Sequence, residues 1–459
     1  MSTPIYIIAA LAASGLATPL QEMAAKRLGR SFSPHIALGG LLVASALVLE
    51  RMLSGSPTVG VAGVFQADPL AYLFSLIMLG VSILVVVSSV EYAKTIENPG
   101  PYYSLLLFAT LGMVLVAFSA DILVLYVAWE LMSISTYALA GIRKRDAYAN
   151  EAAVKFFILG ALSSGTILYA ISLTLGVAGS TNIYEVQKAL GTLKPELAPF
   201  MYLSIALFIA GFGLKTVVVP FHMWMPDVCE GSPTTVVTLL AAATKTGGFA
   251  AVIRVLVVAA SLLKPLWASP FALLALLTMT LGNVAALTQR SLPRLLAYSS
   301  IAQAGFILIG FAVPTPPGVT GAVYHTLNYA FMKGGAFIAA AAASYAAGAT
   351  SLESYAGMGR RMPLTALALT FCLLALAGVP PLNGFWSKLI LFTAAIDGGM
   401  AWLALAGVLN SAFSLAYYAW VMKRLYLDEP PSEERVREHP AFVIPLLIVT
   451  AFIVLSGIY

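Results

Sequence analysis

Long apolar segments follow one another along most of the 459-residue chain, and they constrain its fold more than any other feature. A membrane-spanning helix needs about 20 predominantly apolar residues. Fourteen such segments, separated by Pro, Gly and charged residues, are expected at approximately 4–20, 34–52, 69–90, 102–119, 121–140, 152–178, 198–227, 234–260, 267–289, 294–313, 319–347, 363–393, 400–427 and 440–458. Only 10% of the residues are charged, which is too few to cover the surface of a soluble fold of this size. The pattern predicts an all-α polytopic membrane protein with about 14 transmembrane helices. It excludes a soluble enzyme, a disordered chain and a nucleic-acid binder.

The Lys and Arg residues between these segments predict an orientation. With the N-terminus outside, the cytoplasmic connections carry 15 of them and the opposite side carries 4. This asymmetry follows the positive-inside rule. The 15 are Lys26, Arg27, Arg30, Lys94, Arg143, Lys144, Arg145, Arg290, Arg294, Arg360, Arg361, Lys423, Arg424, Arg435 and Arg437. An even number of spans then places both termini outside. The first apolar run starts at Pro4 without a basic region before it, so we expect a retained helix and a prokaryotic plasma membrane.

Several ionisable residues fall inside the predicted spans, where each charge costs at least about 2.5–3.5 kcal/mol. They are Glu130, Lys155, Lys215, Lys245, Arg254, Lys333 and Lys388, together with His222 and His325. Burial lowers the pKa of a lysine from its usual value of about 10.4, and a nearby carboxylate raises it again. A lysine whose acidic partner approaches and withdraws can therefore bind and release a proton. Simpler explanations apply to some members: Arg254 and Lys155 can extend to the membrane surface, and His325 can be a hydrogen-bonded core residue.

Cofactor and metal ligands are not evident in the sequence. The two cysteines, Cys229 and Cys372, lie 143 positions apart and form no CxxC motif. They cannot supply the four thiolates of an iron–sulfur cluster. We expect no cofactor and no metal in this chain.

Two of the predicted spans are interrupted by helix-breaking residues. The seventh contains Gly211, Gly213 and Pro220 around Lys215, and the twelfth contains the run 378–384 before Lys388. Broken helices at matching places in two halves indicate an ion site near the middle of the membrane. We therefore expect two inverted five-helix repeats, at 98–263 (helices 4–8) and 264–430 (helices 9–13). Residues 1–97 would form helices 1–3, and 431–459 helix 14. A shift of 169 positions aligns the repeats, for example Gly179 with Gly348.

One long motif surrounds the first break and reads Lys215-Thr-Val-Val-Val-Pro-Phe-His-Met-Trp-Met-Pro-Asp227-Val-Cys-Glu-Gly-Ser-Pro233-Thr. This motif resembles a signature of the antiporter-like membrane subunits of respiratory complex I and related redox-driven ion pumps. These subunits belong to the Mrp-antiporter superfamily. The Pro-Asp-Val-x-Glu-Gly-x-Pro-Thr portion and the stretch that begins at Asn150 look most like subunit N. The likeness covers roughly 100–395.

The resemblance implies a proton relay through four residues. Glu130 matches the family's glutamate on the fifth helix, and Lys215 its partner lysine at the break of the seventh. Lys245 matches a connecting lysine on the eighth helix, and Lys388 a lysine on the twelfth that governs exchange with the opposite side. Lys155 matches an additional lysine typical of subunit N. Further relay candidates are His222, His325, Tyr329 and Lys333.

The run His325-Thr-Leu-Asn-Tyr329-Ala-Phe-Met-Lys333 departs from the relatives it resembles, the larger L and M subunits. Tyr329 stands where those subunits have a second histidine. The three residues share one face of a helix. A tyrosine passes hydrogen bonds but stays neutral near pH 7, so the path here is expected to depend more on water. The chain ends soon after the last span, so we expect no long lateral helix like that of subunit L.

Three functions fit this sequence. The first is a proton-translocating subunit of a complex I-type pump that binds no electrons itself, with flavin, iron–sulfur clusters and quinone in partner subunits and with paralogous antiporter-like subunits beside it. The second is a subunit of a multi-subunit cation/proton antiporter or of a membrane-bound hydrogenase-type complex. The third is an inert structural subunit, which the cost of the interior charges disfavours.

Overall fold

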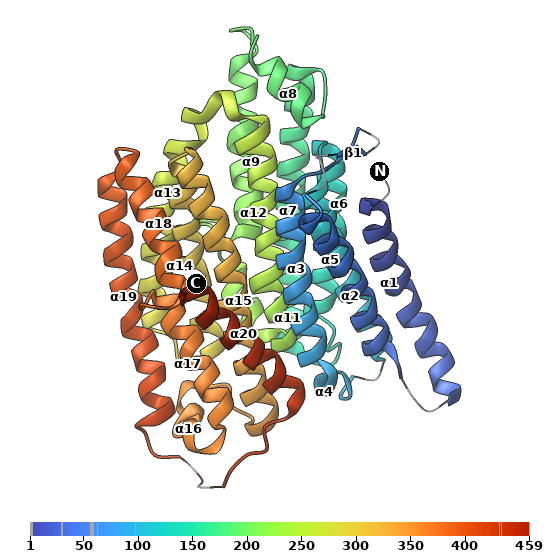
Figure 1. Cartoon of the computed structure of the whole chain (residues 1–459), viewed down its shortest axis with the longest axis vertical. Coiled ribbons are helices and arrows are strands. Elements are labelled where there is room, and N and C mark those ends of the chain that lie inside the picture. The colour runs from blue at the N-terminus through green and yellow to red at the C-terminus, as the bar shows by residue number, and fades with distance from the viewer. Residues whose placement is uncertain are drawn as a thin grey trace. The chain divides into compact units, whose positions relative to one another are not determined.

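The computed structural model describes residues 3–28, 31–55, 59–61, 63–96, 98–430, 432 and 434–458. Arg30, one of the counted cations, and the predicted domain ends at 97 and 431 lie outside these residues. The helices of the amino-terminal half are α1 (Thr3–Leu28), α2 (Ser33–Leu53), α3 (Pro69–Ser88), α4 (Val90–Ala93), α5 (Pro99–Phe118), α6 (Ile122–Ala140), α7 (Ala147–Ala178), α8 (Ile183–Leu190), α9 (Ala198–Thr216), α10 (Trp224–Gly231), α11 (Thr234–Thr238) and α12 (Lys245–Val252) (Figure 1). Strands β1 (Val59–Val61) and β2 (Phe65–Ala67) form a short antiparallel hairpin.

The carboxy-terminal half continues with more long helices. They are α13 (Lys264–Leu287), α14 (Leu292–Ala312), α15 (Pro316–Ala347), α16 (Met358–Arg361), α17 (Pro363–Ala377), α18 (Asn383–Asp397), α19 (Ala401–Tyr426) and α20 (Pro440–Ile458). Short π- and 3₁₀-helices lie at η1 (Leu239–Thr244), η2 (Ile253–Ala259), η3 (Ser261–Leu263) and η4 (Leu352–Tyr355).

The structure confirms the predicted polytopic helical fold. Among the described residues, twelve helices are long and apolar enough to cross a membrane, and each coincides with a predicted segment. The other two predicted segments are also helical. One is α15, which carries His325 and Lys333, and the other is the interrupted pair α17 and α18.

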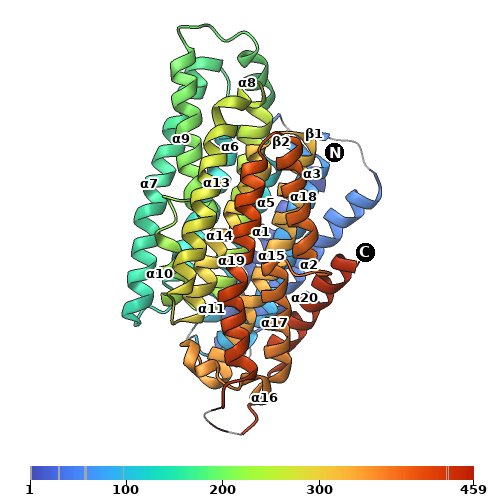
Figure 2. The same cartoon turned by 90° about the vertical axis from the view of Figure 1, so that its left-hand side faces the viewer.

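The chain divides into two compact units. The first comprises Met1–Val86, Ala93–Thr216 and Ala243–Trp267, and the second comprises Val87–Tyr92, Val217–Ala242 and Ala268–Tyr459. In the first unit α5 packs between α1 and α6, and α7 packs on α6 and α9. In the second unit α15 packs on α14, α17, α18 and α20, and Figure 2 shows α19 alongside α17. The predicted relay residues are therefore held by two separate helix clusters.

The two predicted repeats have matching helices and contacts. Helices α7 and α15 both have 32 residues, start 169 positions apart, and end at a left-handed glycine, Gly179 or Gly348. The amide of Ile122 donates to Thr181, and that of Leu292 donates to Thr350, which is the same contact 169–170 positions later. These helices and contacts are therefore spaced 169–170 positions apart, as in the alignment of the two predicted repeats.

Glycines allow close helix packing at equivalent places in both repeats. A Cβ atom on Gly112 of α5 would lie 2.5 Å from the backbone nitrogen of Met132, and one on Gly282 of α13 would lie 2.5 Å from that of Ala302. Since these neighbours are backbone atoms, rotation of a side chain cannot make room. The small residues therefore set the spacing of α5 and α6, and of α13 and α14.

We expect Gly112→Ala to destabilise the protein by about 1–3 kcal/mol, because the added methyl group forces α5 away from α6. Gly165→Ala on α7 is the matched control: no atom lies within 4 Å of the added Cβ, and alanine favours a helix by about 0.5–1 kcal/mol over glycine. Thermal unfolding of the purified protein measures both. Equal melting temperatures for the two variants would contradict the packing described here.

Arg254 differs from the expectation that it extends to the membrane surface. Its side chain is only 2% exposed, and its two terminal nitrogens donate to both oxygens of Asp68 at 2.7 and 2.8 Å. It also donates to the carbonyl of Ala117 at the end of α5. This fork-shaped pairing compensates the cost of burying the charge, so Arg254 joins the start of α3 to η2 and the end of α5.

Candidate functional site

Glu130 lies half-buried on α6, where it faces the neighbouring helix α7. The hydroxyl of Ser164 on α7 donates a short hydrogen bond to its carboxylate. Within the described part of the chain, Glu130 makes no ion pair with Lys215. The carboxylate is thus held by a neutral donor and stays available to a nearby cation.

Lys215 is buried one residue before the end of α9. Its Nζ donates to Thr136 Oγ1 at 3.3 Å and lies 4.6 and 4.9 Å from the ring centres of Phe156 and Tyr137. An ammonium has three protons to donate, and aromatic faces satisfy a cation only in part. The ammonium group of Lys215 is therefore held by one long hydrogen bond and two aromatic faces.

The chain leaves helical geometry directly after Lys215. Val217 has a φ of 58°, the one positive value for a non-glycine residue among those described. A β-branched residue rarely adopts this conformation, and such strain concentrates at functional sites. The predicted break of the seventh span is confirmed: α9 ends at Thr216 and α10 begins at Trp224.

Lys245 lies at the junction of the π-helix η1 and α12 and is fully buried. One turn further along α12, a Cβ on Gly248 would lie 3.6 Å from Lys215 Cβ, so this face of α12 packs against the Lys215 segment of α9. π-Helical segments occur mostly at functional sites. The structure therefore brings Glu130, Lys215 and Lys245 into one cluster of helices, α6, α9 and α12.

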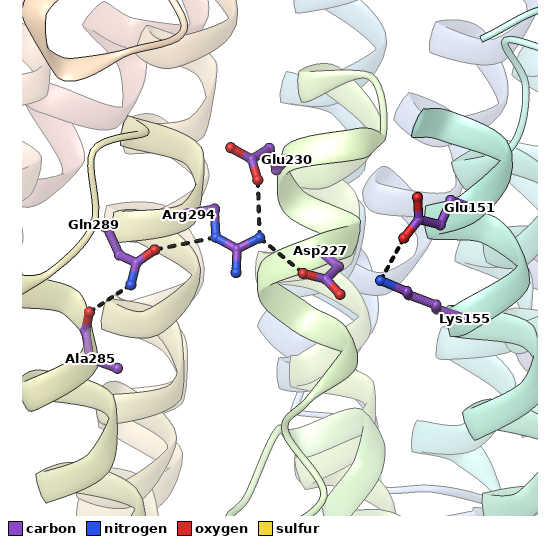
Figure 3. A network of polar contacts seen from close by, with 7 residues as sticks. All are labelled: Glu151, Lys155, Asp227, Glu230, Ala285, Gln289 and Arg294. Carbon is purple, nitrogen blue, oxygen red and sulfur yellow. Dashed lines mark hydrogen bonds and ion pairs between the residues drawn. The ribbon is translucent and has the colours of Figure 1, made fainter. Parts of the chain in front are cut away.

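Lys155 lies on the exposed face of α7 and forms an ion pair with Glu151 at 2.7 Å, as Figure 3 shows. Its side chain is 45% exposed, in contrast to the buried lysines.

His222 lies in the segment between α9 and α10 and is half-buried. Its Nδ1 is buried and has no hydrogen-bond partner among the described residues.

Lys388 is buried on α18, after the second break. Its Nζ donates to the carbonyls of Leu376 and Ala377, at 2.8 and 3.1 Å, and to Ser411 Oγ at 2.9 Å. The three acceptors match the three protons of an ammonium. Gly378 separates α17 from the break with a φ of 87°, and a Cβ there would lie 3.1 Å from the Lys388 stem. The second predicted break is therefore confirmed, and its glycine makes room for the lysine.

One contact of Lys215 and one contact of Lys388 fall at equivalent positions of the two repeats. Lys215 touches Thr136 and Phe156. Lys388 lies 4.4 Å from the ring of Phe306, and that ring in turn contacts the rings of His325 and Phe392. Positions 306 and 325 follow 136 and 156 by 170 and 169 residues. The two lysines reach these matching sites from opposite sides of their helix breaks.

His325, Tyr329 and Lys333 share one face of α15, but their polar groups have different partners. His325 bonds Gln303 and Ser387 at 3.0 and 2.8 Å. The remaining contacts are Tyr329 to the carbonyl of Ala241 and to Ser300, and Lys333 to the carbonyl of Leu296 and to Ser299. All three residues are buried. Each of the three residues is therefore hydrogen-bonded to its own set of partners on neighbouring segments, and these contacts do not link the three to one another.

The motif Asp227-Val-Cys-Glu230 has a structural role at the end of α10. Arg294 at the start of α14 donates to Asp227 at 2.9 Å and to Glu230 at 3.0 Å, and also to Gln289 at 3.2 Å (Figure 3). One arginine thus pairs with both acids and joins α10 to α14.

Sequence reasoning missed the neutral polar partners: Thr136, Ser164, Ser299, Gln303, Ser387 and Ser411. Serine and threonine are common in membrane helices, so they give no signal. Gln303 was recognisable in principle as a lone amide in an otherwise apolar span. Within the described residues, no three His, Cys, Asp or Glu side chains gather as a possible metal site.

Comparison with protein families matches residues 119–414 to the transmembrane family described as NADH:quinone oxidoreductase/Mrp antiporter. Among similar curated proteins, F(420)H(2) dehydrogenase subunit N of Methanosarcina mazei is 42% identical over 402 residues, which cover 85% of this chain and 81% of that protein. NADH-quinone oxidoreductase subunit N of Moorella thermoacetica is 39% identical over 451 residues, covering 98% and 92%.

Solved structures show the same fold. A chain of respiratory complex I from Thermus thermophilus superposes with a TM-score of 0.80 at 29% identity, covering 98% of this chain and 97% of that one. A chain of an archaeal membrane-bound sulfane sulfur reductase gives 0.86 at 28% identity, covering 99% and 94%. A chain of the Mrp complex from Dietzia gives 0.89 at 20% identity, covering 100% and 94%, and is similar in fold alone.

Proposed function

The chain belongs to the NADH:quinone oxidoreductase/Mrp antiporter transmembrane family, and on that premise we propose that it is the proton-translocating, antiporter-like subunit N of a redox-driven membrane complex. The relatives that are about 40% identical are named as subunits N of quinone oxidoreductase and F(420)H(2) dehydrogenase, which favours a redox complex over a stand-alone antiporter. Flavin, iron–sulfur clusters and quinone belong to partner subunits in this proposal, and paralogous antiporter-like subunits lie beside it.

The observation that carries the proposal is the burial of four lysines, Lys215, Lys245, Lys333 and Lys388. The hydrogen bonds of Lys215, Lys333 and Lys388 run to hydroxyl groups and backbone carbonyls. A permanently charged group at such a position costs several kcal/mol. That cost is acceptable where the group must bind and release a proton. The ion pair of Arg254 and Asp68 in the same fold shows the contrasting solution for a structural cation, which is to bury it together with a carboxylate.

The proposed switch is electrostatic. Approach of the Glu130 carboxylate favours the ammonium form of Lys215, and its withdrawal, or a new neighbouring charge, favours release of the proton to Lys245. Lys388 governs exchange with the other side of the membrane. Lys155, His222, His325, Tyr329 and Lys333 are additional relay candidates. We place the chain in a prokaryotic plasma membrane with both termini outside, as the Lys and Arg asymmetry favours.

The assembled complex in sealed vesicles tests this function. The expected result is internal acidification or alkalinisation, according to orientation, that starts on addition of the electron donor, stops when the donor is exhausted, and collapses with a proton uncoupler. An imposed sodium gradient should cause no proton movement without the donor. Sodium-driven proton movement that ignores the donor would identify a cation/proton antiporter instead.

A further inference from the structure

The hydrogen bonds around His325 define which of its ring nitrogens carries a proton in the neutral form. Gln303 on α14 faces the carbonyl of Leu376 at 2.9 Å and His325 Nε2 at 3.0 Å, and its side chain also hydrogen-bonds Tyr418. The Leu376 carbonyl only accepts hydrogen bonds, so the amide NH₂ of Gln303 must face it. The amide oxygen then faces His325 Nε2. Because this oxygen also only accepts, Nε2 must carry the hydrogen.

The orientation of Gln303 is itself fixed by the second helix break. The Leu376 carbonyl, near the end of α17, accepts from Gln303 Nε2 and from Lys388 Nζ at 2.9 and 2.8 Å. Its two lone pairs are thus both used. Turning the Gln303 amide over would place two carbonyl oxygens against each other in a buried site, which is costly. The position of Gln303 is therefore tied to the carbonyl that also holds Lys388.

The other ring nitrogen of His325, Nδ1, faces Ser387 Oγ at 2.8 Å. Ser387 lies in the first turns of α18, next to Lys388, and its hydroxyl is also 3.2 Å from the carbonyl of Gly384. The hydroxyl has one proton and two possible acceptors. It donates to Nδ1 when His325 is neutral, and to Gly384 when Nδ1 carries a proton and donates to Oγ.

We propose that Gln303 is a positioning residue that holds His325 as its Nε2–H tautomer, so that Nδ1 alone accepts and releases a proton, and that the hydroxyl of Ser387 passes this proton. In the transfer, an incoming proton binds Ser387 Oγ, the original hydroxyl proton moves to Nδ1, and the hydroxyl then points to the Gly384 carbonyl. Release reverses these steps, so the serine gains and loses one proton in each direction. This inference rests on the proposed proton-translocating function and adds the atom of His325 through which the proton enters and leaves.

Solid-state NMR of the assembled complex with ¹³C,¹⁵N-labelled histidine tests the tautomer directly. The His325 signal is identified as the one that disappears in His325→Gln. The expected result is the neutral Nε2–H form in the native protein and loss of that preference in Gln303→Leu. A neutral Nδ1–H form in the native protein would overturn the inference. Because this readout needs no turnover, it stands even if the complex fails to translocate protons, which would count against the proposed function only.

Proton uptake per electron pair tests the serine. Ser387→Ala should lower uptake through this subunit about tenfold or more, since a positioned acid–base group contributes on the order of 10²-fold or more, and Ser387→Thr should restore it by returning the hydroxyl. Thr326→Val is the matched control, because among the described residues the buried hydroxyl of Thr326 bonds only the carbonyl of Ala322 in its own helix. Native uptake in Ser387→Ala, or equal losses in Ser387→Ala and Thr326→Val, would contradict the role assigned to Ser387.

Discussion

Replacing Lys215 by methionine lowers donor-driven proton uptake through this subunit about tenfold or more, while the complex still assembles. Methionine fills a similar volume and packs well beside the rings of Phe156 and Tyr137, so the fold is retained. The substitution removes the ammonium group that is proposed to bind and release a proton at this site, and such a group contributes on the order of 10²-fold or more to proton transfer. The initial rate of the pH change in vesicles, at equal subunit content, measures the effect.

Lys423→Met is the matched control for this experiment. Lys423 lies at the end of α19 with a side chain 60% exposed and a distant partner, Asp428, at 4.0 Å. The same change of residue type there should leave proton uptake close to native. If Lys215→Met kept native uptake with normal assembly, Lys215 would have no part in the relay.

Replacing Arg254 by leucine destabilises the protein by about 3–5 kcal/mol, because it leaves the carboxylate of Asp68 without its cation in a poorly hydrated place. The two bonds to the Ala117 carbonyl are lost as well. Thermal unfolding of the purified protein in detergent measures the loss. The double variant Arg254→Leu with Asp68→Leu should be more stable than Arg254→Leu alone, since it removes the unpaired charge.

Arg143→Leu provides the comparison within the same unit. Arg143 pairs with Asp146 at 3.3 Å, but its side chain is 42% exposed, and such surface pairs contribute only about 0–1 kcal/mol. A melting temperature of Arg254→Leu as high as that of Arg143→Leu would show that the buried pair does not stabilise the fold.

The parts of the fold that follow from hydropathy were predictable from the sequence. Helix positions, the two breaks and the register of 169 between α7 and α15 rest on apolar runs, Pro, Gly and charge, which act locally. The π-helices η1 and η2 were not predictable, because an i→i+5 bond has no distinct residue pattern. The division into two compact units was not predicted either, since it depends on packing between distant segments.

The candidate site shows the same division between local and long-range information. A lysine in an apolar run is conspicuous, so Lys215, Lys245, Lys333 and Lys388 were found, and the structure places all four in the interior. Arg254 was misjudged because its partner, Asp68, lies 186 positions away in the sequence. The partners of His325 were missed because Gln303 and Ser387 are neutral and come from two other helices.

The number of protons moved per electron pair, rather than the rate, tests most directly whether buried lysines carry the protons. A ratio is insensitive to the amount of intact complex, so it separates a lost relay from poor assembly. We measure this ratio for Lys388→Met in sealed vesicles, with normal subunit content. We predict that the variant moves fewer protons per electron pair than the native complex, and that the difference equals the number of protons moved by this subunit. A native ratio in that variant would contradict the account.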